Sequence, residues 1–291
     1  MGKTALVLSG GGAKGAFQVA AEKYAREEHG YHWDIIAGVS VGALNGAMLA
    51  MEKFDQLDQL WKTLSNRCVY TGKWNLWAAI RLLFGAKSIY GNEPLREIIE
   101  REVEPDKIKA DLRVGAVSLS NGNYTIYRKD DPNLKHAILA STVMPIIWPP
   151  QHVSAECQYM VDGSLRRFSP IGDVLDTDPD EVVIISCRPQ KPGIIDKPFK
   201  NILDIGIRTY DIASDEIVSG DIAEFLHINR NVREAANGGV TLHNVKGKEY
   251  REYRCRIIEP VESLGSMMDF SHDAIKRSMK IGRERAKEIL G

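Results

Sequence analysis

The chain of 291 residues carries a formal net charge of −1, with 44% hydrophobic and 26% charged residues. This balance is ordinary for a globular protein, and it excludes a general electrostatic attraction to nucleic acid or to an anionic membrane. No apolar run approaches the roughly 18 residues of a membrane-spanning helix, and no signal peptide is seen after Met1. We therefore expect a cytoplasmic protein with one domain over residues 1–291 and no nucleic-acid partner. The sequence leaves the oligomeric state open.

The cysteines and histidines lack the spacing of metal ligands. The cysteines lie far apart without a C-x-x-C pair, so we expect free thiols at Cys68, Cys157, Cys187 and Cys255. The seven histidines are equally scattered. The sequence therefore predicts neither a metal site nor a cofactor.

The first predicted strand leads into a glycine-rich loop. Residues 4–9 are a short apolar run typical of a buried parallel strand, the sequence Gly-Gly-Gly-Ala-Lys-Gly follows, and a helix is expected over 16–28. Free amides at a helix N-terminus bind anions. Two anions fit: a nucleotide phosphate, since Gly10, Gly12 and Gly15 match G-x-G-x-x-G, or the oxyanion of an acyl-transfer intermediate.

A G-x-S-x-G sequence stands between the second predicted strand, residues 33–37, and a helix expected over 41–50. A serine on a sharp turn between a strand and a helix is typical of the nucleophile elbow of hydrolases. Gly38 and Gly42 flank Ser40, where the crowded backbone requires residues without a Cβ. The context predicts that Ser40 is a nucleophile.

The glycine loop and Ser40 are expected to meet, because adjacent parallel strands end at the same edge of a sheet. The nucleotide interpretation predicts a second strand that ends in an acidic residue, but Asp34 begins that strand and Ser40 follows its end. We therefore favour an oxyanion site made by backbone amides of the loop and of the residue after the serine: Gly10, Gly11, Gly12 and Val41.

Two helical runs follow. Residues 54–65 place their apolar side chains on one helical face. Trp74–Phe84 is dense in Trp, Leu, Ile and Phe. Three interpretations stay open for it: a buried helix, a lid, or a contact with a membrane surface. Because the chain has little net charge, any contact with lipid is expected to be local and apolar.

The second half alternates strands and helices. Strands are expected over 112–119, 124–128, 182–186 and 250–258, and helices over 92–103, 133–140, 201–229 with a break near Gly220, and from Ser271 to the end. Strands that alternate with helices indicate a mostly parallel sheet covered on both faces. The sequence predicts a three-layer α/β/α domain.

Four stretches taken together resemble the patatin-like phospholipase family. They are the glycine loop, the sequence around Ser40, Ala140–Pro145 with Trp-Pro-Pro shortly after it, and the Asp-Gly pair at Asp162 and Gly163. The similarity is strong over residues 4–50 and 137–173. It implies the family's Ser–Asp dyad, with Asp162 as the partner of Ser40. Ser164 stands where the family usually has Gly or Ala.

The resemblance implies hydrolysis of phospholipids or other acyl esters through an acyl-enzyme, with Asp162 taking the proton of Ser40. Burial is expected to raise the pKa of Asp162 and make it a better base. Lys14 has two open interpretations, a contact to developing negative charge or to a substrate phosphate, and a solvated lysine. A triad histidine is not expected, since His272 is expected in a capping cluster and His243 in a loop.

Other function classes stay open. The same dyad can serve an acyltransferase or a thioesterase, and a similar pocket can belong to a lipid-binding module without catalysis. The presence of Ser40, Asp162 and the glycine loop together favours the hydrolase, because a binding module needs none of these three.

Overall fold

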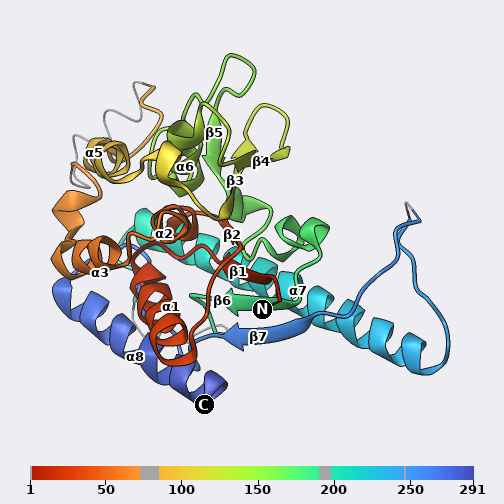
Figure 1. Ribbon diagram of the computed structural model, residues 1–291. Coiled ribbons are helices and arrows are strands. Elements are labelled where there is room, and N and C mark those ends of the chain that lie inside the picture. The colour runs from red at the N-terminus through yellow and green to blue at the C-terminus, as the bar shows by residue number, and fades with distance from the viewer. Residues whose placement is uncertain (1, 73–84, 190–197, 246) are drawn as a thin grey trace.

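The computed structural model describes residues 2–72, 85–189, 198–245 and 247–291. Within them, seven strands form one sheet in the order β4-β3-β2-β1-β6-β7, with β5 paired to β3 (Figure 1). The strands are β1 Thr4–Leu8, β2 Ile35–Gly38, β3 Asp111–Ser118, β4 Tyr124–Arg128, β5 Met160–Asp162, β6 Glu181–Ile185 and β7 Arg254–Ile258. The pairs β3–β2, β2–β1, β1–β6 and β6–β7 are parallel. Strands β4 and β5 each pair antiparallel with β3.

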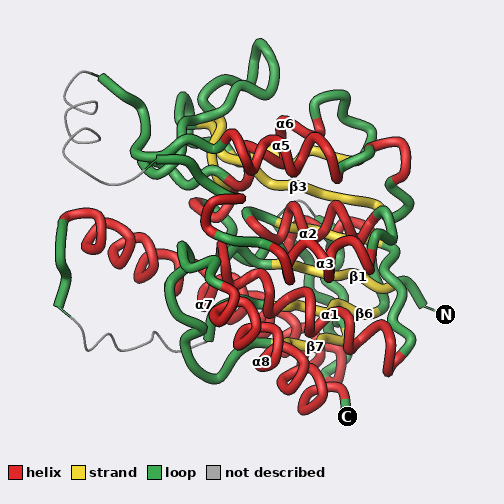
Figure 2. Tube along the Cα trace, turned by 90° about the vertical axis from the view of Figure 1, so that its left-hand side faces the viewer, coloured by secondary structure: helices red, strands yellow, loops and turns green. Residues whose placement is uncertain are grey.

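The central strands β1, β2, β3 and β6 are buried on both faces of the sheet, as their continuous apolar sequences predict. In β1, Leu6 and Leu8 face one core, whereas Ala5 and Val7 face the other. Figure 2 shows α1, α2, α3 and α8 in front of the strands, and α7 packs on the opposite face through Val218, Ile222 and Phe225. The three-layer α/β/α fold expected from the sequence is confirmed.

The helices are α1 Gly15–His29, α2 Val41–Ala50, α3 Phe54–Thr63, α5 Glu93–Glu102, α6 Leu134–Thr142, α7 Ile202–Asn237 and α8 His272–Leu290.

Two strands share one edge of β3 and meet end to end. The first half of β3 pairs with β2, where Gly38 lies opposite Val114. The second half of the same strand pairs with β5, where Asp162 lies opposite Ala116. The end of β2 and the end of β5 therefore converge, and this arrangement brings together two residues that are far apart in the sequence, Ser40 and Asp162.

Helix α7 differs from the expectation of a break near Gly220. It is continuous over 36 residues, about 54 Å at the usual rise of an α-helix. Gly220 is exposed, and a Cβ there would have open space around it. The buried residues Val218 and Ile222 hold the helix against the sheet on both sides of the glycine, so packing outweighs its low helix propensity.

The segment Trp74–Phe84, for which a lid, a membrane contact and a buried helix were all open, lies outside the described residues. Among the helices that are described, none combines the length and the hydropathy needed to cross a membrane.

Candidate active site

Ser40 lies on a strained turn between β2 and α2, as the G-x-S-x-G sequence predicts. Its backbone has φ 56° and ψ −132°, an unfavourable region for a residue with a side chain. A Cβ at Gly38 would lie 2.2 Å from the carbonyl oxygen of Gly42, and one at Gly42 would lie 2.4 Å from that of Leu8. Only glycine fits on either side of the serine, and the strained turn is held by the close approach of these backbones.

The amide of Ser40 is fixed by a residue from another element. It donates a hydrogen bond of 2.9 Å to Oγ of Ser141, a fully buried side chain near the end of α6. Ser141 lies inside the stretch that resembles the patatin family, but its side chain was not assigned a role from the sequence. The structure gives it one, because this bond stabilises the turn that presents Ser40.

Asp162 ends β5, and its side chain is buried, with the residue only 2% exposed. The amide of Ser164 donates to Oδ1 of Asp162 at 2.8 Å. Burial raises the pKa of the Asp162 carboxyl to about 6, against the lowering effects of the hydrogen bonds from the Ser164 amide and the Ser40 side chain. At neutral pH this carboxylate is largely ionised and is more basic than an ordinary aspartate.

Three of the four amides expected in the oxyanion site are free. Within the described residues, the amides of Gly11, Gly12 and Val41 have no hydrogen-bond acceptor. Gly10 does not fit the expectation, because its amide donates to the carbonyl of Phe168 at 3.1 Å. Gly10 is required for steric reasons, since a Cβ there would lie 2.3 Å from Oγ of Ser164.

The interpretation of Lys14 as a solvated lysine is wrong, and its expected contact with a substrate stays a prediction. The residue is 5% exposed and is absent from the lining of the pocket that contains Ser40. Its Nζ lies 3.9 Å from Oδ1 of Asp211 on α7. Burial lowers the pKa of Lys14, and the nearby Arg188 lowers it further. Lys14 belongs to a buried group of charges behind the glycine loop, a position that the sequence does not reveal because its partners lie far along the chain.

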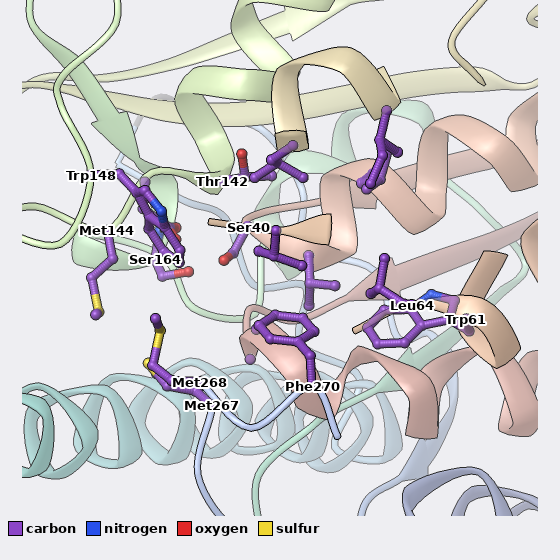
Figure 3. Close-up of a pocket in the computed structure, with 18 of the residues that line it drawn as sticks. Ser40, Trp61, Leu64, Thr142, Met144, Trp148, Ser164, Met267, Met268 and Phe270 are labelled. Atoms are coloured by element: carbon purple, nitrogen blue, oxygen red, sulfur yellow. The ribbon is translucent and has the colours of Figure 1, made fainter. Parts of the chain in front are cut away.

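Ser40 and Asp162 line a narrow, largely apolar pocket that is open to solvent. Figure 3 shows Met144 and Trp148 on one side of Ser40 and Trp61 and Phe270 on the other. The lining residues are Gly11, Gly12, Ser40, Val41, Leu44, Leu60, Trp61, Leu64, Val69, Leu95, Ile98, Thr142, Met144, Trp148, Asp162, Ser164, Phe168, Tyr210, Met267, Met268 and Phe270.

Several of these lining residues were missed from the sequence. Tyr210 comes from α7, and Met267, Met268 and Phe270 come from the loop before α8. Their only sequence signal is apolar character, which is shared with every core position. The loop is bound to the site through its backbone, because the amide of Ala13 donates to the carbonyl of Met267 at 2.8 Å.

All seven histidines are exposed, and none lines the pocket. His272 begins α8, where the side chain of Ser271 accepts the capping hydrogen bond from the amide of Ala274. His243 lies in the hairpin after α7. In the described part of the chain, no three His, Cys, Asp or Glu side chains are grouped closely enough to hold a metal ion. The four cysteines are free thiols.

Comparison with known proteins identifies the family. A sequence model of the patatin-like phospholipase family matches residues 6–175, more than half of the chain. The chain belongs to the patatin-like phospholipase family. This is a family of lipid acyl hydrolases, and the matched region contains the glycine loop, Ser40 and Asp162.

The crystal structure of VipD from Legionella pneumophila is similar in fold to this patatin-like chain. The two share 14% sequence identity with a TM-score of 0.52, and the match covers 99% of this chain and 66% of VipD. The chain thus spans about two thirds of the length of that structure, and the likeness concerns the fold alone. A search of curated proteins found no match.

Proposed function

We propose that this patatin-like protein hydrolyses acyl esters of phospholipids or other lipids with Ser40 as nucleophile and Asp162 as its base. The observation that carries the proposal is the convergence of these two side chains with three free backbone amides at one apolar pocket. A binding site needs neither a strained serine nor a carboxyl whose pKa is raised to about 6.

The reaction follows from this arrangement. Asp162 takes the proton of Ser40 while Oγ attacks the ester carbonyl, and the amides of Gly11, Gly12 and Val41 stabilise the resulting oxyanion. The tetrahedral intermediate then expels the alcohol, which receives the proton from Asp162, and acyl-Ser40 remains. Water attacks this ester with Asp162 again as base, the second tetrahedral intermediate expels Oγ of Ser40, which receives the proton back from Asp162, and the fatty acid leaves. The apolar walls of the pocket would bind the acyl chain.

The proposed dyad predicts which variants lose activity. Ser40→Ala and Asp162→Asn should each lower hydrolysis of a lipid ester by at least about a thousandfold, in the range seen when a nucleophile or base is removed. His272→Ala and His243→Ala should retain most activity. Each variant should be assayed for fatty-acid release and for labelling by a fluorophosphonate, with circular dichroism as a check of folding. A folded histidine variant as inactive as Ser40→Ala would replace the dyad with a triad.

We further propose that residues 1–291 act as one folded unit. The supporting observation is the strand order, since β1 at the middle of the sheet pairs with β2 on one side and with β6 on the other.

A further inference from the structure

The first turns of α7 and the residues just before it carry exposed apolar side chains that nothing described so far uses. Four of them form the α7 stripe, and their exposed fractions are 50% for Phe199, 74% for Ile202, 51% for Ile205 and 52% for Ile212. Ile202, Ile205 and Ile212 recur at intervals of three and seven residues, so they project from one side of the helix. Exposed isoleucines in such a row are typical of a binding surface, whereas single exposed apolar residues are ordinary.

The stripe is mainly apolar, with charged residues at its border. The exposed positions described between residues 202 and 213 are Ile202, Ile205, Gly206, Thr209, Ile212 and Ala213, all uncharged. Lys200, next to Phe199, is exposed, and the half-buried Arg208 lies three residues after Ile205 and four before Ile212, on the same side of the helix. A helical face of this kind suits a partner with an apolar interior and a polar surface.

The opposite side of the same helix reaches the catalytic pocket. Tyr210 lines the pocket with Ser40 and Asp162. The next residue, Asp211, accepts a 2.6 Å hydrogen bond from Arg188, and Arg188 also bonds Asp215 at 2.5 Å. These buried ion pairs fix α7 to the end of the sheet, so the stripe is held at a set position beside the pocket. Figure 2 shows the first turns of α7 projecting at the left, beyond the body of the sheet.

A second exposed isoleucine stands at the pocket from another direction. Ile146 is 70% exposed and has φ 74°, a left-handed conformation that is a marked outlier for a β-branched residue. Met144 and Trp148, two positions before and after it, line the pocket. The turn is held in place by the amide of Ile89, which donates to the carbonyl of Ile146 at 2.9 Å. The protein thus holds an apolar side chain outward at an energetic cost.

We propose that the α7 stripe and Ile146 form a docking surface for a phospholipid membrane or micelle. This inference rests on the proposed function, because a lipid ester pocket must meet its water-insoluble substrate at an aggregate surface. A lipid surface fits the observations better than a second copy of the chain does. The stripe is mainly apolar, it lies on the helix that also lines the pocket, and residues on both sides of Ile146 line the same pocket. In this arrangement α7 lies in the interface with its outer side in the acyl region.

Vesicle binding without turnover tests the surface. In a Ser40→Ala background, Ile202→Gln/Ile205→Gln should lower partitioning onto phosphatidylcholine vesicles at least tenfold, because apolar transfer free energy scales with the buried area. The matched control is Leu226→Gln/Val240→Gln, which removes two exposed apolar side chains, 40% and 56% exposed, near the other end of α7. It should bind as the parent does. Uncharged glutamine keeps electrostatic effects out of the comparison.

Ile146→Asn gives a second, independent variant. Asparagine accepts a positive φ more readily than isoleucine, so the melting temperature should stay the same or rise while vesicle partitioning falls. A structural role for Ile146 would instead lower the melting temperature.

The outcomes separate the docking surface from the proposed chemistry. Equal vesicle binding by the stripe variant and its control, or no binding by the Ser40→Ala parent, would overturn the surface, whatever the native enzyme hydrolyses. A change of sedimentation coefficient in the stripe variant with vesicle binding unchanged would overturn it in favour of self-association. Failure of the native enzyme to release fatty acid would reject the proposed function and leave the binding result standing.

Discussion

At the scale of single residues, the site combines two unfavourable features. Ser40 is held in a strained backbone conformation, and Asp162 is a carboxyl removed from water. The burial that raises the pKa of Asp162 to about 6 also makes its ionised form unfavourable in the folded state. A group of this kind stabilises the fold when protonated and less so when ionised. The proposed catalytic arrangement is therefore expected to lower the stability of the protein at neutral pH.

Asp162→Asn should stabilise the protein at pH 8 and leave it nearly unchanged at pH 3.5. Because the folded-state pKa lies above the ordinary value of 3.8, the native state binds more protons than the unfolded state between about pH 4 and pH 6. Stability of the native sequence therefore falls as pH rises through that window. The neutral asparagine avoids the loss, with an upper limit of about 3 kcal/mol at 1.36 kcal/mol per pKa unit. Urea denaturation at both pH values measures it.

Ser40→Ala is the comparison for this experiment, since it removes the proposed nucleophile and keeps the buried carboxyl. Because it also removes a hydrogen bond that lowers the pKa of Asp162, this variant should keep or enlarge the fall in stability between pH 3.5 and pH 8, whereas Asp162→Asn should abolish it. If Asp162→Asn changes the free energy of unfolding equally at both pH values, the native protein and this variant differ in stability for a reason other than desolvation of the carboxylate.

At the scale of elements, α7 is joined to the site by buried charges. Arg188 follows the end of β6 and is 1% exposed, with its guanidinium between Asp211 and Asp215 and over the ring of Phe168. Two cations, Lys14 and Arg188, face two carboxylates on α7. The group is balanced in charge, so loss of one member leaves an uncompensated ion inside the protein.

Arg188→Met should lower the free energy of unfolding by about 3–5 kcal/mol, the range for breaking a buried ion pair from one side. The matched control is Arg283→Met, because Arg283 pairs with Glu28 at 3.0 Å on the surface with both side chains about half exposed. That variant should change stability by less than about 1 kcal/mol. Chemical denaturation of both compares them directly.

A third variant checks the cause. Arg188→Met/Asp215→Asn removes one cation and one carboxylate, leaves Lys14 with Asp211, and should recover part of the loss. An equal loss in the single and double variants would assign the effect to packing of the arginine stem rather than to charge.

The sequence predicted those parts of the site that are local. The elbow at Ser40 and the glycine loop are each set by a strand, a turn and a helix that are contiguous in the chain, and both are found as expected. The burial of Lys14, the use of the Gly10 amide and the contribution of Tyr210 depend on residues brought in by the fold. No local pattern in the sequence reports such partners.

The predicted break in α7 near Gly220 was wrong because it relied on local helix propensity alone. Glycine lowers helix stability by about 1 kcal/mol relative to alanine, and this local preference suggested a break at Gly220. Val218, Ile222 and Phe225 bury apolar area against the sheet over the same stretch, and burial of one such side chain is worth about 1.5–3 kcal/mol. Tertiary packing therefore decides the continuity of the helix.

At the scale of the whole molecule, the region matched by the family model is shorter than the folded domain. It stops at residue 175, whereas β6, β7, α7 and α8 follow it. Helix α8 packs on α1, where a Cβ at Gly282 would lie 2.3 Å from the carbonyl oxygen of Phe17. The loop before α8 and helix α7 supply pocket walls through Met267, Phe270 and Tyr210. The C-terminal residues are therefore part of the site.

Removal of the residues after 175 should prevent folding. In such a fragment β1 would lose its pairing with β6 and become an edge strand, although its side chains are buried on both faces. An edge of this kind is open to aggregation. We expect residues 1–175, expressed alone, to be insoluble or to lack a cooperative thermal transition. A cooperative transition in the fragment would show that the family-matched region is a separate domain.

A second break in the chain gives the matched comparison, because it leaves β1 and β6 together in one fragment and places only the edge strand β7 in the other. Gly239 lies just beyond α7, where a side chain would have open space, and the hairpin that follows projects from the body of the molecule at the right of Figure 1. Exposed loops of this kind tolerate cleavage. Coexpressed fragments 1–239 and 240–291 should therefore assemble and hydrolyse lipid ester as the intact chain does, because β7 and α8 can still pair with β6 and α1. Coexpressed fragments 1–175 and 176–291 should recover less activity, because each exposes a central strand until the two meet.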